Sequence, residues 1–250
     1  MPADELTRAD PEELAGLTDE QAGRILLRGE LEVRGRMPFS SNETFLVVVH
    51  CDGLALRAVY KPHRGERPLW DFPDGLHRRE VAAYELSRAL GWGLVPVTVL
   101  RADGPMGEGS LQRFVPADFD QHYFTLYEDP ARHDELRRIC CFDLVGNNTD
   151  RKAGHCLAGL DGRVHAIDNG LMFHREFKLR TVIWEFGGEP IPAGVHEDLA
   201  RFAESDLPPA LVGLLDPFER DALAARAAAL ARSSTFPIDG TGRRYPWPLV

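Results

Sequence analysis

The sequence lacks the features of a membrane or disulfide-rich secreted protein. Residues 1–10 are acidic and polar with no apolar signal segment, and the most conspicuous apolar run, residues 45–49, is far too short to span a bilayer. Four cysteines in 250 residues are too few for a disulfide scaffold, and no C-x-x-C pair suggests a zinc site. We therefore expect a cytoplasmic protein with reduced thiols and no transmembrane segment.

Basic side chains are also scarce. The chain has 29 lysines and arginines against 39 acidic residues, a formal net charge of -10. Nucleic acids and anionic membranes select for excess positive charge, so the balance argues against either partner. What is present, 44% hydrophobic and 27% charged residues, is typical of one compact domain or of two small lobes that share a cleft.

The first half of the chain has the pattern of a sheet with one inserted helix. Thr18 and Gln21 form a capping box before a short helix that Gly29 ends. Alternating apolar residues then predict strands within residues 31–60, with a hairpin at Asp52-Gly53. The spacing next predicts a helix over residues 76–90, followed by strands at 95–100 and 110–114.

The second half is predicted to be mainly helical. Pro116 marks the change of character, and helices are expected over residues 135–145 and 211–231, with a loop-like tail from 233. We therefore predict an α+β fold of two lobes: an antiparallel β-rich N-lobe at residues 1–115 and a helical C-lobe at 116–250.

Two aspartates in the second half are candidates for chemistry. Asp150 follows a helix in a tight polar turn, and Asp168 ends the second of two short strands that flank a turn at Asp161-Gly162. Such strands bring the two carboxylates together, and paired carboxylates suit divalent-metal and phosphoryl chemistry. Asp168-Asn169-Gly170 also fits a plain hairpin turn. Asp143 lies on the buried helix face, so it must find a hydrogen-bond donor or shift its pKa.

These motifs resemble those of the phosphatidylinositol 3-/4-kinase-like superfamily of atypical kinases. The resemblance rests on Asp150-Arg151 and, about 18 residues later, Ile167-Asp168-Asn169-Gly170, together with Tyr60-Lys61-Pro62 at a strand end and Arg79-Glu80 on the next helix. Fam20-type and HipA-type kinases have similar motifs, and the chain is also similar to an actinobacterial kinase-like family. The similarity covers residues 31–173 and implies a kinase-like fold and ATP as cofactor.

The resemblance also implies roles for individual residues. Lys61, held by Glu80, contacts the α- and β-phosphates of ATP. Asp150 accepts or orients the acceptor hydroxyl, and Asp168 holds the metal ion. The residues implied to lie over the phosphates or to form the adenine-binding hinge are Ser40, Ser41, Asn42, Gln112, Phe114 and Val115.

His155 departs from the superfamily pattern, because it stands where the second metal ligand is expected. Imidazole is a poor ligand for Mg²⁺ and a better one for Mn²⁺. Three alternatives stay open: the metal differs, His155 binds phosphate, or a single ion is used. The expected cofactors are therefore ATP with Mg²⁺ or Mn²⁺. The chain has no G-x-G-x-x-G loop, which fits the atypical kinases rather than the typical ones.

The leading hypothesis is an ATP-dependent phosphotransferase that acts on a hydroxyl of a protein or small polyol. The lack of a polybasic surface disfavours a lipid acceptor, although Lys61, His63, Arg64 and Arg67 leave room for an anionic one. The alternatives are a pseudokinase that binds nucleotide without transfer, a nucleotidyl transferase, and a metallohydrolase. The residues that would ligate the metal in this last case are His155, His165, Asp168 and His174.

Overall fold

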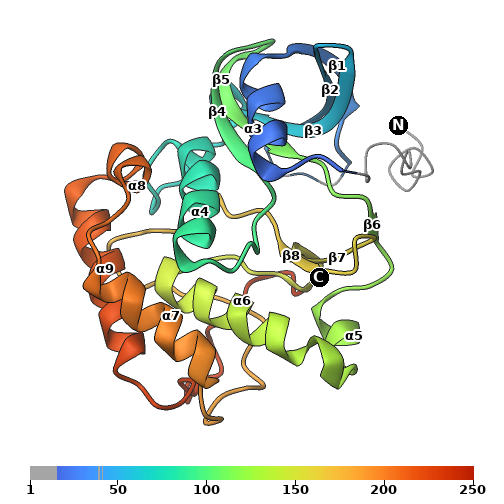
Figure 1. Ribbon diagram of the computed structural model, residues 1–250. Helices are drawn as coiled ribbons and strands as arrows, with labels where there is room; N and C mark the ends of the chain where they lie inside the picture. The colour runs from blue at the N-terminus through green and yellow to red at the C-terminus, as the bar shows by residue number, and fades with distance from the viewer. Residues whose placement is uncertain (1–15, 39, 41) are drawn as a thin grey trace.

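The protein has two lobes of unequal size (Figure 1). The computed structural model describes residues 16–38, 40 and 42–250. The smaller lobe contains an antiparallel sheet, and the larger one is mostly helical, so the predicted α+β fold is confirmed. No helix in these residues is both long and apolar enough to cross a membrane.

A five-stranded antiparallel sheet forms the N-lobe, in the order β1-β2-β3-β5-β4. Its strands are β1 (Glu30–Arg36), β2 (Phe45–Cys51), β3 (Leu54–Pro62), β4 (Thr98–Gly104) and β5 (Gly107–Arg113). The β4 strand begins three residues later than the predicted start at residue 95. The helix α3 (Asp19–Arg28) packs against this sheet, and its N-terminus has the predicted capping box.

The β3 strand has two distinct faces because side chains alternate across a strand. Leu56, Ala58 and Tyr60 are buried in the core of the lobe, whereas Val59 and Lys61 alternate with them and are half-buried. The predicted hairpin before β3 is present, with Asp52 and Gly53 both in the left-handed region that this tight turn requires. Lys61 therefore leaves the sheet from the face opposite the lobe's core.

The helix α4 (Leu76–Leu90) has the predicted bounds and lies between β3 and β4 in the chain. Gly91 ends it in the left-handed conformation, where a side chain would be strained. The helix contacts β4 and β5 on one side and the helices of the C-lobe on the other (Figure 1). It therefore carries Glu80 at the junction of the lobes, with only 3% of this residue exposed.

The C-lobe begins with a second, smaller sheet. The strands β6 (Ala117–Asp118), β7 (Cys156–Gly159) and β8 (Val164–Ala166) pair antiparallel in the order β6-β7-β8. Between β6 and β7 the chain forms α5 (Tyr123–Tyr127) and α6 (His133–Gly146), and α6 matches the predicted helix at 135–145. The short β7–β8 turn returns the chain toward α4 (Figure 1), and Asp168 after β8 contacts Lys61 of the N-lobe.

The predicted single helix over residues 211–231 is wrong. The structure has two helices here, α8 (Pro209–Leu214) and α9 (Pro217–Ala231), separated by Leu215 and Asp216. Asp216 caps the N-terminus of α9 with its side chain and Pro217 occupies the first turn, so a new helix begins at this point. The helix α7 (Ala193–Glu204) was not predicted from the sequence.

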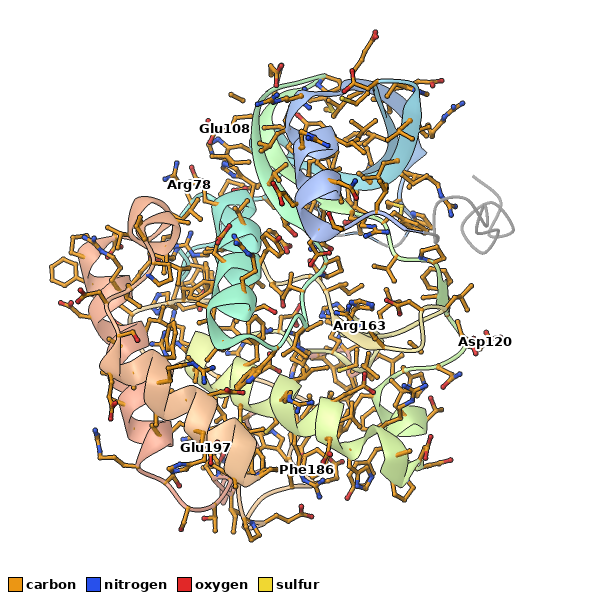
Figure 2. The ribbon with its side chains drawn as sticks, viewed as in Figure 1. Arg78, Glu108, Asp120, Arg163, Phe186 and Glu197 are labelled. Atoms are coloured by element: carbon orange, nitrogen blue, oxygen red, sulfur yellow. The ribbon has the colours of Figure 1, made fainter. Side chains whose placement is uncertain are left out.

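An aromatic cluster supports the base of the C-lobe. Phe186, which lies below α6 in Figure 2, is fully buried and contacts the rings of Tyr127, His133 and Phe236. The guanidinium of Arg137 stacks over its ring at 4.8 Å. These contacts join α6 to the segments before α7 and after α9, so the helical layer has one continuous core.

Candidate functional site

A lysine from the N-lobe meets two carboxylates where the lobes face each other. Lys61 Nζ at the end of β3 donates to Glu80 Oε1 on α4 and, at 2.7 Å, to Asp168 Oδ1 after β8. The second oxygen of Glu80 accepts the backbone N–H of Asn169 at 3.0 Å. Glu80 therefore bridges a strand of the small lobe and the loop after β8.

The charges of this cluster stabilise one another. The Lys61 ammonium holds the pKa of Asp168 well below its usual range. Burial works to lower the pKa of Lys61, but Asp168 and Glu80 outweigh burial and the pKa is raised. Lys61 and Asp168 are therefore both charged at neutral pH. The Asp168 side chain is still 54% exposed, so its carboxylate is open to a ligand.

Asp150 lies in a loop that begins directly after α6. Asn147 ends the helix in the left-handed conformation, and the Asn148 side-chain oxygen accepts the Asp150 backbone N–H at 2.9 Å. The Asp150 carboxylate is 27% exposed and lies 3.3 Å from Lys152 Nζ. Burial raises its pKa, Lys152 opposes that shift, and the negative charge of Asp168 adds to it.

A fully buried ion pair holds this loop in place. Arg151 Nη2 lies 2.9 Å from Asp143 Oδ1, and both side chains are 0% exposed. Arg151 also donates to the Ile167 carbonyl and to Asn169 Oδ1, each at 2.7 Å. The expected burial of Asp143 with a donor is thus observed. Because Arg151 is enclosed, it positions the loops that carry Asp150 and Asp168 rather than facing an acceptor.

His155 lies beside the candidate metal ligand Asp168. Its Nε2 atom is 3.4 Å from Asp168 Oδ2, and its Nδ1 atom accepts the Lys152 backbone N–H at 3.3 Å. Burial lowers the pKa of His155 to about 4, so the ring is neutral at pH 7. Acceptance at Nδ1 places the ring proton on Nε2, which faces the aspartate.

The other predicted metal group does not assemble. His165 bonds to Asp161 in the β7–β8 turn, and His174 bonds to the backbone of Glu176. Of the four residues considered for a metallohydrolase, His155 and Asp168 are the pair that the described structure brings together. Asp168-Asn169-Gly170 is also not a hairpin turn, because no strand follows β8 before α7 in the residues described.

The residues expected to surround the nucleotide are mostly engaged with protein neighbours. Ser40 Oγ lies 2.8 Å from Thr44 Oγ1, and Asn42 Oδ1 accepts the Arg67 backbone N–H at 3.0 Å. Ser41 lies outside the described residues. Gln112 is buried and donates to Thr98 Oγ1 at 2.9 Å. These bonds connect Ser40, Asn42 and Gln112 to neighbours within the N-lobe.

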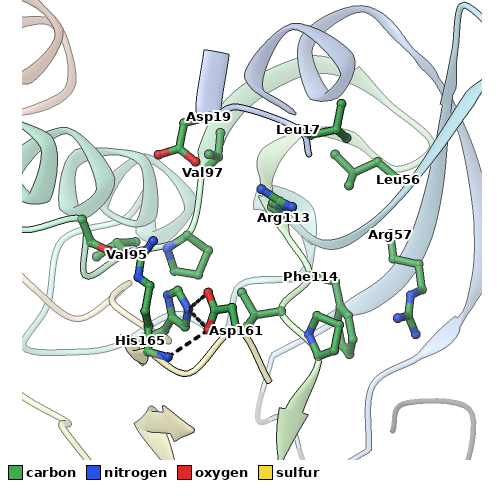
Figure 3. Close-up of a pocket in the computed structure, with 15 residues that line it drawn as sticks. Leu17, Asp19, Leu56, Arg57, Val95, Val97, Arg113, Phe114, Asp161 and His165 are labelled. Atoms are coloured by element: carbon green, nitrogen blue, oxygen red, sulfur yellow. Dashed lines mark hydrogen bonds and ion pairs between the residues drawn. The ribbon is translucent and has the colours of Figure 1, made fainter. Parts of the chain in front are cut away.

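Phe114 and Val115 line a cavity of about 230 Å³ at the connection between the lobes (Figure 3). The lining also includes His165 and Asp161, which hydrogen-bond to each other (Figure 3). Among the described residues, the lining of this cavity does not include Lys61, Asp150 or Asp168, so the cavity is separate from the charged cluster. Phe114 itself is nearly buried, with the Arg57 guanidinium 4.8 Å from its ring centre.

Sequence reasoning missed two residues that touch the charged cluster. Asn169 links Glu80 to Arg151 through its backbone N–H and its side-chain oxygen, and Lys152 pairs with Asp150. An asparagine directly after a candidate metal ligand is a signal that could have found the first. The position of Lys152 depends on the turn after residue 150, for which the sequence offers no comparable signal.

The overall architecture is that of a kinase-like protein. A Golgi casein kinase with Mn/ADP bound matches with a TM-score of 0.57 at 16% identity, over 85% of this chain and 74% of that chain. The hydra Fam20 structure with sugar gives 0.57 at 14% identity, over 89% and 88%. The Helicobacter pylori proinflammatory kinase CtkA gives 0.50 at 10% identity, over 84% and 94%. These similarities establish the two-lobed atypical kinase-like fold.

Sequence similarity gives the family. Protein Rv2133c of Mycobacterium tuberculosis is 40% identical over an alignment 270 residues long, and the alignment covers 92% of this chain and 95% of that protein. The chain therefore belongs to the Rv2133c family. No protein-family model matches the sequence.

Proposed function

We propose that this protein is an ATP-dependent phosphotransferase that moves the γ-phosphate to a hydroxyl acceptor. The observation that carries the proposal is the contact of Lys61 with both Glu80 and Asp168 across the lobes. A half-buried lysine whose charge is fixed by two carboxylates suits a phosphate contact, and an exposed aspartate beside it suits the binding of a divalent metal. The kinase-like fold supports the same assignment.

In the proposed reaction, Asp150 orients the acceptor hydroxyl and takes its proton. The acceptor oxygen forms a bond to the γ-phosphorus, the bond from that phosphorus to the β–γ bridging oxygen breaks, and ADP leaves with the bond's electron pair. Lys61 contacts the α- and β-phosphates, and Glu80 keeps its ammonium in place. The raised pKa of Asp150 makes its carboxylate a better proton acceptor than an ordinary aspartate.

The donor set fits a divalent cation. Asp168 offers an exposed carboxylate, and His155 lies within 3.4 Å of it. We propose Asp168 as the principal ligand and His155 as a second one, which favours Mn²⁺ over Mg²⁺ because imidazole is the softer donor. A cation held by these residues would neutralise charge on the phosphates. We propose that Ser40, Ser41, Asn42, Gln112, Phe114 and Val115 surround the nucleotide.

We also propose that the chain is a member of the phosphatidylinositol 3-/4-kinase-like superfamily, is located in the cytoplasm and divides into lobes at residue 116. The sequence motifs and composition support these assignments.

One observation favours a second candidate, a pseudokinase that holds nucleotide without transfer. His155 Nδ1 is already occupied by the Lys152 N–H, so ligation through Nε2 requires the other tautomer and the loss of that bond.

The test is a measurement of ADP release and of transferred phosphate from γ-labelled ATP, with Mn²⁺, Mg²⁺ or a chelator. We expect metal-dependent turnover, faster with Mn²⁺, and a loss of at least about 100-fold in kcat for Asp150→Asn. The matched control is Asp120→Asn, since Asp120 is exposed on the loop after β6 (Figure 2).

The outcomes separate the alternatives. Nucleotide binding without metal-dependent turnover supports the pseudokinase and overturns transfer. Covalent addition of the nucleotide rather than phosphate, seen by mass spectrometry, identifies a nucleotidyl transferase. Turnover that survives both Asp150→Asn and Lys61→Met contradicts the site assignment, because it requires another catalytic group.

A further inference from the structure

A second cavity, of about 220 Å³, has Asp150 in its wall. Its other walls come from the loop at residues 69–72, from the segment at residues 171–180, and from Trp247 near the C-terminal end of the described chain. Its lining does not include Lys61 or Asp168, so the cavity adjoins Asp150 but is distinct from the proposed phosphate contacts. A hydroxyl group bound in this cavity would lie next to the proposed base.

The lining has an excess of positive charge, although the whole chain carries a net charge of -10. Three basic residues, Lys152, Lys178 and Arg180, face two acids, Asp71 and Asp150. Lys152 pairs with Asp150 and Lys178 with Asp71, each at 3.3 Å. The extra positive charge of the lining is therefore that of Arg180, which is exposed and has no ion-pair partner within the residues that the structure describes.

The backbone of Arg180 is fixed relative to Asp150. Its N–H donates to the Asn148 carbonyl at 2.8 Å, and its carbonyl accepts the Arg151 N–H at 3.1 Å. The chain therefore pairs with the catalytic loop on both sides of Asp150. Arg180 is thereby held on the same wall of the cavity as Asp150, and a guanidinium binds phosphate or carboxylate oxygens in pairs.

Trp247 adds a flat apolar wall to this charged cavity. The residue is 86% exposed, and the tail that carries it is tied to the catalytic loop by the bond from the Ala153 N–H to the Leu249 carbonyl, at 2.7 Å. In Figure 1 the C-terminus accordingly lies beside β7 and β8. An exposed indole next to a cation favours a ligand with a carbon framework and an anionic group.

We propose that this cavity binds the acceptor, and that the acceptor is a small polyhydroxyl compound with an oxyanion group, of the sugar-phosphate class. Arg180 binds the oxyanion, Trp247 contacts the carbon framework, and a free hydroxyl reaches Asp150. The proposal rests on the phosphotransferase function and adds a substrate class to it. The small volume favours such a compound over an acidic peptide.

Binding is tested first, because it does not require catalysis. Inorganic phosphate, glucose 6-phosphate and glucose are titrated by calorimetry into the full-length wild-type protein and into Arg180→Ala, Arg180→Lys and Arg24→Ala. Arg24 is an exposed arginine on α3 and serves as the matched control for charge removal. We expect glucose 6-phosphate to bind more tightly than glucose, with an affinity about tenfold weaker in Arg180→Ala. Arg180→Lys should recover part of this loss, and Arg24→Ala should match the wild type.

Transfer is tested second, with the same sugars and with a serine peptide that carries acidic residues. We expect glucose 6-phosphate to be a better acceptor than glucose, with a KM about tenfold higher in Arg180→Ala. Equal affinity of wild type and Arg180→Ala for glucose 6-phosphate overturns the proposal, as does Arg180-dependent use of the peptide with no binding of sugar phosphate. Arg180-dependent binding without any ATP turnover leaves the ligand site standing and instead refutes the phosphotransferase function.

Discussion

Replacing Arg151 by methionine tests the buried ion pair that supports the candidate catalytic loop. The variant removes a guanidinium that is 0% exposed and leaves Asp143, equally buried, without its main partner. Thr181 Oγ1 at 3.1 Å and Asn148 Nδ2 at 3.1 Å remain as donors to this carboxylate. Burial already raises the pKa of Asp143, and Arg151 opposes that rise, so the variant shifts the carboxyl toward its protonated form.

The expected cost follows from this enclosure. Removing one partner of a buried ion pair destabilises a protein by about 3–5 kcal/mol, because the remaining carboxyl must either stay charged in the interior or take up a proton. Methionine fills a similar volume, so little of this cost comes from a cavity. Domains are commonly stable by only about 5–15 kcal/mol, and the variant should therefore lose a large part of the free energy of unfolding.

Urea unfolding at pH 7, followed by circular dichroism, measures the effect. Arg88→Met is the control, because Arg88 forms an exposed pair with Glu85 at 3.1 Å and should cost less than about 1 kcal/mol. The double variant Arg151→Met, Asp143→Leu has no buried charge at this site. Its loss in free energy of unfolding should therefore be about 1–3 kcal/mol smaller than the sum of the losses of the two single variants. If Arg151→Met costs no more than Arg88→Met, the interpretation of the pair is refuted.

Two further predictions concern α4. Burial acts to lower the pKa of His77, but the carboxylates of Glu66 and Glu108 outweigh burial, so the pKa is raised in the folded protein. The contribution of protonated His77 to stability is therefore complete below the unfolded-state pKa of about 6.5. It is lost as the pH rises through the pKa of His77 in the folded protein. Urea midpoints between pH 5 and 9 should thus fall more steeply for the wild type than for His77→Gln, and parallel curves would contradict this. Arg79→Met should cost about 3–5 kcal/mol in urea unfolding, because it leaves Glu219 buried without its partner on α4; a loss below about 1 kcal/mol would show that Glu219 finds other donors.

Elements with strong local signals could be predicted from the sequence. The helix at Leu76–Leu90 has apolar residues at helical spacing and a glycine stop, and both of its ends match the prediction. The β2–β3 hairpin follows from alternation around Asp52-Gly53. In each case the interactions that decide the structure lie within a few residues, so the sequence alone contains them.

The helices near the C-terminus show the opposite case. The apolar pattern of residues 211–231 is continuous enough to suggest one helix, yet the helical structure is interrupted before Pro217. Asp216 and Pro217 are local capping signals that outweighed periodicity here. The helix α7 buries Val195, Leu199 and Phe202 through its packing in the C-lobe, and a preceding stretch rich in proline and glycine concealed its start.

For the candidate site, residue types and spacing predicted candidate residues, and the resemblance implied the contact of Lys61 with Glu80, but the other contacts depend on the tertiary structure. Lys61 and Asp168 are separated by 107 positions, and their 2.7 Å contact exists because the two lobes pack against each other. The residues expected to surround the nucleotide show that such contacts are hard to predict, since Ser40 and Gln112 form hydrogen bonds to threonines within their own lobe. Such competition between a ligand and protein neighbours depends on tertiary geometry, which residue type and spacing do not encode.

The position of α4 connects this geometry to the C-terminal helices. Arg78, at the outer side of α4 in Figure 2, donates to the Gly213 carbonyl at 2.8 Å, and Arg79 pairs with Glu219 on α9. Glu80 is the next residue, and its two oxygens contact Lys61 and the Asn169 N–H. Because consecutive residues of one helix anchor it to α8, to α9 and to the charged cluster, a shift of α4 that separates Lys61 from Glu80 must also break a buried ion pair. The lysine–glutamate contact is therefore stabilised by the C-lobe itself.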